Sequence, residues 1–485
     1  MLAVACSSGH PVSGGSQPVT SAAGRRPNVV FVLTDDLSTD LLQYMPHVRD
    51  MQRQGLTFSN YFVTDSLCCP SRSSIFTGRL PHSTGVFTNT APDGGFPLFY
   101  RRGEEKDTFA TALRSDGYRT ALMGKYLNDY DPRHTPGQRG PYVPPGWTEW
   151  DATGNGYGEF NYNTNQNGRV VHYGFEPKAY LTDVIAANGL TFVRGSLDAG
   201  SPFLLELASF APHSPYVPAP RDRRLFPGLH APRTPAFDAP VAGAPAWLAA
   251  VPPLGPPAIS GIDEAYRMRA QAVQAVDQML GRIEDELRAA HQLDNTYIVF
   301  SSDNGYHMGE HRLRPGKLTA FDTDIKVPLV VVGPGVPAGR TVDQVVENID
   351  LRPTFEELGG SGPGPAVEGR SLLPLLRGQT PADWRTAALV EHHGPVGAGA
   401  DEPDRAVPFA GDPPTYEAIR TATALYVEYV DGEREYYDVA RDPDELTNLA
   451  AQLPVDQTAR LHTALAGMAG CVGGDGCWSA QHVSS

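Results

Sequence analysis

The stretch NVVFVLTDD, residues 28–36, decides the fold class. A run rich in β-branched and apolar residues is followed at once by two adjacent carboxylates, Asp35 and Asp36. A short run of this kind is typical of a strand buried on both faces of a parallel sheet. The two carboxylates would then lie at the carboxyl end of that strand, where open α/β sheets bind their ligands.

Four further apolar runs follow the same design. They span residues 118–123, 203–210, 296–300 and 327–332, and a segment with helical periodicity spans residues 263–290. Polar clusters follow three of these runs: Gly124-Lys125, Ala211-Pro212-His213 and Ser301-Ser302-Asp303-Asn304-Gly305. The alternation predicts an α/β fold with a large, mainly parallel sheet flanked by helices, and one shared site at its carboxyl edge.

Two segments do not fit the alternation. Residues 131–180 hold several aromatic and amide side chains, and we interpret them as a long loop insertion near the strand ends. These side chains suit stacking on and hydrogen bonding to sugar rings, and a self-packed surface loop is the alternative. Residues 215–257 form a second, proline-rich excursion.

The character of the chain changes after residue 378. Residues 420–430 and 433–439 flank Asp431-Gly432, which predicts a β-hairpin, and a helix is expected after Asn448. We therefore predict a catalytic domain over residues 25–378. A smaller C-terminal α+β domain that carries an antiparallel sheet is predicted over residues 379–485.

The net charge of the chain limits the kinds of partner that it can bind. The 485 residues carry a formal net charge of −16 and have no basic run, which excludes a nucleic-acid footprint. An acidic surface repels an anionic polymer, so any site for one must be locally basic. Only five of the 39 basic residues are lysines, so a lysine within a motif is notable.

The two ends of the chain point to an extracytoplasmic location, either secreted or lipid-anchored at the cell surface. LAVACSSG, residues 2–9, resembles the end of a bacterial lipoprotein signal with Cys6 as the lipidated residue, and residues 1–24 would be a signal remnant and tether; an accidental match is the alternative. No apolar run is long enough to span a membrane, so a lipid anchor at Cys6 would be the only membrane contact. Cys471 and Cys477 have a spacing that suits a local disulfide, and two free thiols are the alternative.

The stretch CCPSRSSIFTGR, residues 68–79, carries the chemistry. It reads C-x-P-S-R-x-x-x-x-T-G-R and resembles the signature that marks a cysteine for oxidation to formylglycine. On this motif the chain is identified as a member of the sulfatase family, within the alkaline-phosphatase-like superfamily. The resemblance implies that a formylglycine-generating enzyme converts Cys68, because only Cys68 has proline two and arginine four residues after it. One hydroxyl of the aldehyde hydrate attacks sulfur, and the other later expels sulfate by reforming the aldehyde.

The resemblance also implies a metal site. Its ligands would be Asp35, Asp36, Asp303 and Asn304, together with the hydrate oxygen of residue 68. In this family the ion is Ca²⁺, and oxygen ligands suit such a hard cation. Mg²⁺ and Mn²⁺ accept the same ligand types, whereas zinc prefers histidine and thiolate.

Four more side chains match the family's sulfate-handling positions. Arg72 would orient the hydrate, while Lys125 and Lys317 resemble the two lysines that bind the sulfate group. His213 resembles the histidine near the leaving-group oxygen, where it can act as a general acid. We expect these four residues and Cys68 to form the catalytic set.

One branch of the family matches best. The stretch GKYLN, residues 124–128, also occurs in sulfatases that act on the 6-sulfate of N-acetylglucosamine, and the likeness extends over residues 25–450. The chain departs from many sulfatases in having Leu127 where a histidine is common, which leaves Asn128 or a water for that role. We expect hydrolysis of 6-O-sulfate on N-acetylglucosamine or glucosamine units of a glycan. The alternatives are an arylsulfatase, a phosphonate or phosphodiester hydrolase, and an inactive glycan-binding surface lipoprotein.

Overall fold

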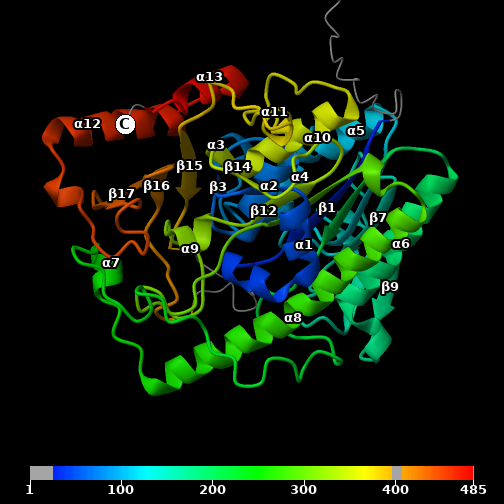
Figure 1. The fold of residues 1–485 in the computed structure, drawn as a ribbon, viewed down its shortest axis with the longest axis horizontal. Coiled ribbons are helices and arrows are strands. Elements are labelled where there is room, and N and C mark those ends of the chain that lie inside the picture. Colours follow the sequence, from blue (N-terminus) through cyan, green and yellow to red (C-terminus); the bar gives the residue numbers. More distant parts are fainter. Residues whose placement is uncertain (1–25, 396–406, 484–485) are drawn as a thin grey trace, which may run out of the picture.

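A computed structural model describes residues 26–395 and 407–483, so the predicted tether with Cys6 lies outside the described residues. The structure is built around a mixed ten-stranded sheet with helices on both faces (Figure 1). The strands, in spatial order, are β13 (Arg340–Val342), β2 (Leu56–Phe58), β12 (Leu329–Val332), β11 (Thr296–Ser302), β1 (Asn28–Thr34), β10 (Phe203–Ala208), β4 (Arg119–Lys125), β7 (Glu149–Thr153), β8 (Tyr162–Gln166) and β9 (Arg169–Tyr173). The five strands from β11 to β7 are parallel to one another, which confirms the predicted fold class.

Strand β1 lies at the centre of the sheet and is buried along its whole length. Val29 and Phe31 pack into the hydrophobic core on one face, whereas Val30 and Val32 pack into the core on the other. This two-sided burial explains why the run contains apolar residues at consecutive positions rather than at every second one.

Helices cover each face of the sheet. One face is covered by α2 (Cys68–Thr77), α4 (Gly95–Arg102), α5 (Phe109–Ser115), α10 (Leu351–Gly359) and α11 (Leu373–Leu376), and the other by α1 (Pro46–Gln54), α6 (Leu181–Asp198) and α8 (Pro256–Ala289). Helix α8 begins seven residues before the predicted segment, because Pro256 occupies its first turn, where a missing N–H costs nothing. Short elements complete this part: α3 (Pro81–Thr84), α7 (Ala246–Ala249), α9 (Asp322–Ile325) and the strand pairs β3 (Tyr61–Phe62) with β14 (Val346–Glu347) and β5 (His134–Thr135) with β6 (Gln138–Arg139).

The interpretation of residues 131–180 as a loop insertion is wrong. Three strands of this segment, β7, β8 and β9, extend the main sheet at one edge. The prediction missed them because their sequences, such as YNTNQ, are polar: β9 is mostly exposed, so no apolar run marks it. The segment does approach the strand ends as predicted, because the turn between β7 and β8 follows the carboxyl end of β7.

The C-terminal region carries a separate antiparallel sheet of four strands, β15 (Ala387–His392), β16 (Tyr416–Thr421), β17 (Ala424–Tyr429) and β18 (Arg434–Asp438), as predicted. The turn at Asp431-Gly432 joins β17 to β18, but residues 420 and 421 belong to the preceding strand. Helices α12 (Val455–Ala469) and α13 (Gly473–Ala480) follow, and a Cys471–Cys477 disulfide ties the connection between them to α13. The domain boundary at residue 378 remains a prediction.

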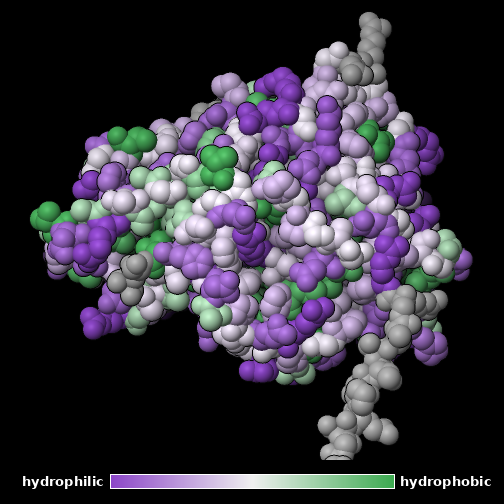
Figure 2. All heavy atoms as spheres, turned by 90° about the horizontal axis from the view of Figure 1, so that it is seen from above, coloured by the Kyte–Doolittle hydropathy of each residue, from purple (hydrophilic) through white to green (hydrophobic). Residues whose placement is uncertain are grey.

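The surface agrees with the acidic, polar composition. Figure 2 shows hydrophilic side chains over most of one face, with hydrophobic side chains scattered among them. Among the helices in the described part of the chain, none combines the length and apolar character needed to cross a bilayer.

Candidate active site

Cys68 lies at the centre of a buried polar cluster. It is the first residue of α2, and its side chain is fully buried. Its Sγ is 3.2 Å from Oδ1 of Asp35 and 2.9 Å from Nζ of Lys317. In the unmodified chain this sulfur marks the place that the hydrate oxygens of a formylglycine would take. The amino end of α2 adds a partial positive charge there, which favours an anion.

The carboxylates meet because two parallel strands end together. Strands β1 and β11 are neighbours, and Thr34 pairs with Ser302, so the residues that follow them lie side by side. The backbone N–H of Asp36 donates to Oδ1 of Asp303 over 3.1 Å. Four acidic or amide side chains therefore converge next to Cys68, as the sequence predicted.

Two buried lysines neutralise the first two carboxylates. Nζ of Lys125 is 2.6 Å from Oδ2 of Asp35, and Nζ of Lys317 is 2.7 Å from Oδ1 of Asp36. Burial alone would lower the pKa of Lys125, but the Asp35 carboxylate and Cys68 raise it well above its usual value. Gly124 lets β4 lie close to β10 just before Lys125, because a side chain at residue 124 would clash with the carbonyl oxygen of Ala208 on β10.

Arg72 holds the third carboxylate. It lies one turn along α2 from Cys68, and its Nε donates to Oδ2 of Asp303 over 2.8 Å while Nη1 donates to the carbonyl oxygen of Lys125. Burial would raise the pKa of Asp303, but Arg72 and the two lysines outweigh it and lower the pKa to about 2. Asp303 is therefore ionised throughout the physiological pH range.

His213 approaches from the loop after β10. Its Nε2 is 3.5 Å from Oδ2 of Asp36, and its Nδ1 is 2.7 Å from the carbonyl oxygen of Ser214. A carbonyl oxygen only accepts hydrogen bonds, so Nδ1 carries a proton. Nε2 therefore carries a proton only when the ring is a cation.

The donor set fits a hard divalent cation. Ligand atoms of Asp35, Asp36, Cys68 and His213 all lie within 4.8 Å of one another. Oδ1 of Asn304 is buried and accepts no hydrogen bond from the described residues, although its Nδ2 donates to Oδ1 of Asp36. A half turn of this amide, which exchanges its oxygen and nitrogen, would present a fifth ligand. Closely placed carboxylate oxygens are what Ca²⁺ and Mg²⁺ prefer.

One supporting residue escaped the sequence analysis. Arg269, on α8, is fully buried, and its Nη2 donates to the carbonyl oxygen of Asp36 and to Oγ of Ser38. Its guanidinium lies over the ring of Tyr306 at 4.3 Å. Its position in the helix was the sequence feature that could have revealed it. Arg269 lies three residues after Tyr266 and four before Val273, on the apolar face of the helix, where an arginine needs a buried partner.

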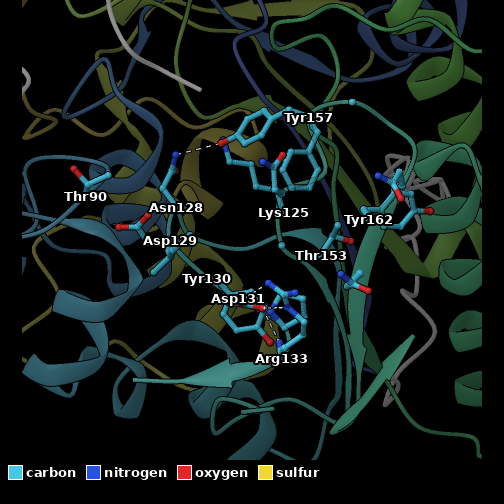
Figure 3. A pocket seen from close by; sticks show the side chains of 18 of the residues that line it. Thr90, Lys125, Asn128, Asp129, Tyr130, Asp131, Arg133, Thr153, Tyr157 and Tyr162 are labelled. Atoms are coloured by element: carbon cyan, nitrogen blue, oxygen red, sulfur yellow. Dashed lines mark hydrogen bonds and ion pairs between the residues drawn. The ribbon is translucent and has the colours of Figure 1, made fainter. Parts of the chain in front are cut away.

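A cavity of about 860 Å³ opens beside the cluster (Figure 3). Its walls come from the loop after β4 and the turn between β7 and β8, and Lys125 lies where the cavity meets the buried cluster. The aromatic and amide lining residues are Asn128, Tyr130, Asn155, Tyr157, Phe160, Asn161, Tyr162, Asn163 and Phe210. Nδ2 of Asn128 donates to the hydroxyl of Tyr157, as the dashed line in Figure 3 shows.

The departure at residue 127 has a structural counterpart. Leu127 is buried and packs into the core cluster on one face of the sheet. Asn128, the next residue, lines the cavity. Next to Leu127 the loop therefore offers the cavity the polar side chain of Asn128, three residues after Lys125.

Comparison with known proteins gives the family. The model of the sulfatase family matches residues 27–361, and that of the C-terminal region of N-sulphoglucosamine sulphohydrolase matches residues 309–469. The chain belongs to the sulfatase family and is a sulfuric ester hydrolase.

Two relatives show where in the family the chain lies. It is 35% identical to the human N-acetylglucosamine-6-sulfatase over 93% of this chain and 86% of that protein. It is 31% identical to an arylsulfatase of Volvox carteri over 93% of this chain and 76% of that protein.

Solved structures share the fold. The structure of BT4656 in complex with its substrate D-glucosamine-2-N,6-O-disulfate has a TM-score of 0.76 at 23% identity and covers 91% of this chain and 97% of its own. A phosphonate monoester hydrolase from Silicibacter pomeroyi has a TM-score of 0.68 at 22% identity and covers 90% of this chain and 93% of its own. At these identities the likeness establishes the fold alone.

Proposed function

We propose that this sulfatase removes 6-O-sulfate from N-acetylglucosamine or glucosamine units of glycans, with a formylglycine at residue 68 and one divalent cation. The observation that supports it best is the placement of Cys68. Its sulfur touches Asp35 and Lys317 at the amino end of α2, next to a cavity lined by aromatic and amide side chains. The identity to N-acetylglucosamine-6-sulfatases supports the sugar.

Different side chains of the cluster would serve different steps of the proposed reaction. With formylglycine at residue 68, one hydroxyl of its hydrate would lose its proton to solvent and attack sulfur as the bond from sulfur to the sugar oxygen breaks. Lys125 and Lys317 would stabilise the charge on the sulfate oxygens, and His213 would give its Nε2 proton to the departing sugar oxygen. The second hydroxyl would then give its proton to solvent, reform the aldehyde and release sulfate, and a water would add to the aldehyde to restore the hydrate.

Asp35, Asp36, Asp303 and Asn304 would hold the cation. When bound, the ion would favour the ionised form of the attacking hydroxyl and help to neutralise the sulfate. The ligand types favour Ca²⁺ or Mg²⁺ over Zn²⁺, and the family resemblance favours Ca²⁺.

The proposal extends to maturation and location. A formylglycine-generating enzyme would be the partner that modifies Cys68, and an oxidising, extracytoplasmic compartment would suit the Cys471–Cys477 disulfide. One of the relatives is described as an extracellular sulfatase, from Drosophila melanogaster; the chain spans 35% of its length. A lipid anchor at Cys6 remains a prediction.

A panel of defined substrates tests the function. We expect sulfate release from 6-sulfated N-acetylglucosamine glycans, slower release from the 3- or 4-sulfated isomers, and loss of activity with a chelator. Faster hydrolysis of a phenyl phosphonate ester would favour a phosphonate hydrolase, and activity restricted to nitrophenyl sulfate would favour an arylsulfatase. Glycan binding without turnover, with a thiol at residue 68, would favour the inactive glycan-binding protein.

A further inference from the structure

Few charged side chains line the cavity beside the Cys68 cluster. Four charged residues of the described chain line it: Lys125, Asp129, Asp131 and Arg133. Lys125 lies at the buried end, beside Asp35 of the Cys68 cluster, where the proposed function places the sulfate group. The outer part of the cavity therefore holds two carboxylates and one guanidinium.

That guanidinium is not available to a ligand's anion. Arg133 donates from Nε and Nη2 to the two oxygens of Asp131, each at 3.0 Å, in a two-pronged ion pair that Figure 3 shows. Nδ1 of His134 lies 2.9 Å from the same carboxylate, and these partners lower the pKa of Asp131 to about 2, against the effect of burial. A paired arginine offers little net attraction to a second anion.

Asp129 leaves one negative charge uncompensated. Its side chain is exposed, and within the described residues its carboxylate forms no ion pair. Figure 3 places it beside Asn128 on one wall, opposite Thr153 and Tyr162. Its backbone has a φ of 63°, in the left-handed region, which asparagine also tolerates well.

The size of the cavity brings neighbouring sugars within range of this charge. Its volume, about 860 Å³, lies near the top of the roughly 300–1,000 Å³ range of small-molecule pockets, so it accommodates more than one sugar ring. Aromatic rings and amides of the lining bind the apolar faces and hydroxyls of neutral sugars.

We propose that the cavity selects glycans in which the sugars next to the sulfated glucosamine are uncharged, and that Asp129 is the residue that disfavours uronate or further sulfate there. This inference rests on the proposed function, because it places the scissile sulfate at the Cys68 cluster. It names the substrate class as a glycan whose sulfated glucosamine has uncharged neighbouring sugars.

Two trisaccharides with the same 6-sulfated N-acetylglucosamine, one flanked by galactose and one by glucuronate, provide the test. The enzyme with formylglycine at residue 68 should have a kcat/KM for the galactose compound that is about 3- to 10-fold higher than for the glucuronate compound at low ionic strength. This is the effect expected of one like charge several ångströms away across partly hydrated space. The preference should shrink in 0.5 M salt, since Asp129 is exposed. Asp129→Asn should reduce the preference to less than half.

Asp198→Asn is the matched control. Asp198 is exposed at the end of α6, before β10 begins, so it lies at the opposite end of the strands from the site. The substitution changes the net charge by the same amount and should leave the preference as in the unsubstituted enzyme. An equal change in both variants would assign the effect to overall charge and overturn the proposal.

Binding measurements distinguish a failure of this inference from a failure of the proposed function. The two trisaccharides are titrated calorimetrically into a Cys68→Ala chain, which cannot turn over. Tighter binding of the galactose compound, weakened by Asp129→Asn, supports the inference even if sulfate release fails. Equal affinities, or a preference for glucuronate, overturn it even if both compounds lose their sulfate.

Discussion

Nε of Arg72 lies 2.8 Å from Oδ2 of Asp303, and both side chains are completely buried. This pair joins helix α2, which carries the residue to be modified, to the end of β11, which carries part of the proposed cation site. Each partner neutralises a charge that would otherwise be buried alone. The pair therefore ties the stability of the core to the geometry of the site.

Asp303→Ala should destabilise the fold and weaken cation binding together. It leaves Arg72 as an uncompensated buried charge, which lowers the free energy of unfolding by about 3–5 kcal/mol. Chemical denaturation with and without Ca²⁺, and the metal content by elemental analysis, measure the two effects. Arg72→Met separates them, because it breaks the same ion pair but removes no ligand. Full metal content and activity in Asp303→Ala would show that the ligand set is wrong.

The aldehyde should form at residue 68 and not at residue 69. The Cys68 sulfur faces Asp35 and Lys317, whereas Cys69 packs into the apolar core, where burial raises its pKa to about 12. Mass spectrometry of the peptide that contains both residues locates the modification. Cys69→Ala, the matched variant, should still be converted; an aldehyde at residue 69 would reverse the assignment.

Cys68→Ser should stop after one turnover while it keeps the fold. A serine sulfate ester has no second hydroxyl with which to expel sulfate, so the product stays on the enzyme. Mass spectrometry should find an adduct of one sulfate at residue 68, and rapid kinetics should show at most one equivalent of product. Sustained turnover by this variant would contradict the hydrate mechanism.

Buried Glu206 predicts a loss of stability as the pH rises. It lies on β10 with no hydrogen-bond partner for either oxygen among the described residues, and burial raises its pKa from 4.5 to about 8, with Arg72 opposing. A raised folded-state pKa contributes stability below pH 4.5 that is lost as the pH rises to about 8, at up to roughly 1.4 kcal/mol per pH unit. Glu206→Gln should therefore be more stable than the unsubstituted protein at pH 8 and similar to it at pH 4.5.

Chemical denaturation at the two pH values measures this difference. Glu264→Gln, on the exposed side of α8, removes the same charge at the surface and should leave the pH dependence unchanged. If Glu206→Gln lowers stability equally at both pH values, Glu206 is ionised in the folded protein.

The sequence predicted the parts of this protein whose residues act locally. The valine-rich run before Asp35 identified the central strand, and the motif after Cys68 identified the family. The residues expected at the site, from six separate segments, do meet in one cluster, because the carboxyl ends of parallel strands share an edge. Their individual roles remain proposals.

Features that depend on tertiary packing were missed. Strand β9 lies at the edge of the sheet and is mostly exposed, and β8 beside it is rich in polar residues although it is mostly buried, so periodicity could not reveal them. Arg269 lies among apolar residues on α8, and only the fold shows that its guanidinium reaches the carbonyl oxygen of Asp36. The pairing of Asp131 with Arg133, which leaves Asp129 as the exposed charge, likewise appears only in three dimensions.

The last prediction separates His213 from Lys317 by the leaving group. Nζ of Lys317 lies 2.9 Å from the Cys68 sulfur, so it would stabilise charge on the transferring group with any substrate. Nε2 of His213 would supply a proton to the departing oxygen, which a sugar alcohol needs and a nitrophenol needs far less. His213→Ala should therefore slow a glycan sulfate at least about 10²-fold more than nitrophenyl sulfate, whereas Lys317→Ala should slow both.

Steady-state kinetics on the two substrates measures this difference. The controls are His462→Ala and Lys178→Ala, at exposed positions on α12 and before α6, and they should behave like the unsubstituted enzyme. Because Nδ1 of His213 already donates to Ser214, only the cationic ring has a proton at Nε2. Equal slowing of both substrates by His213→Ala would make His213 a binding or structural residue instead of the general acid.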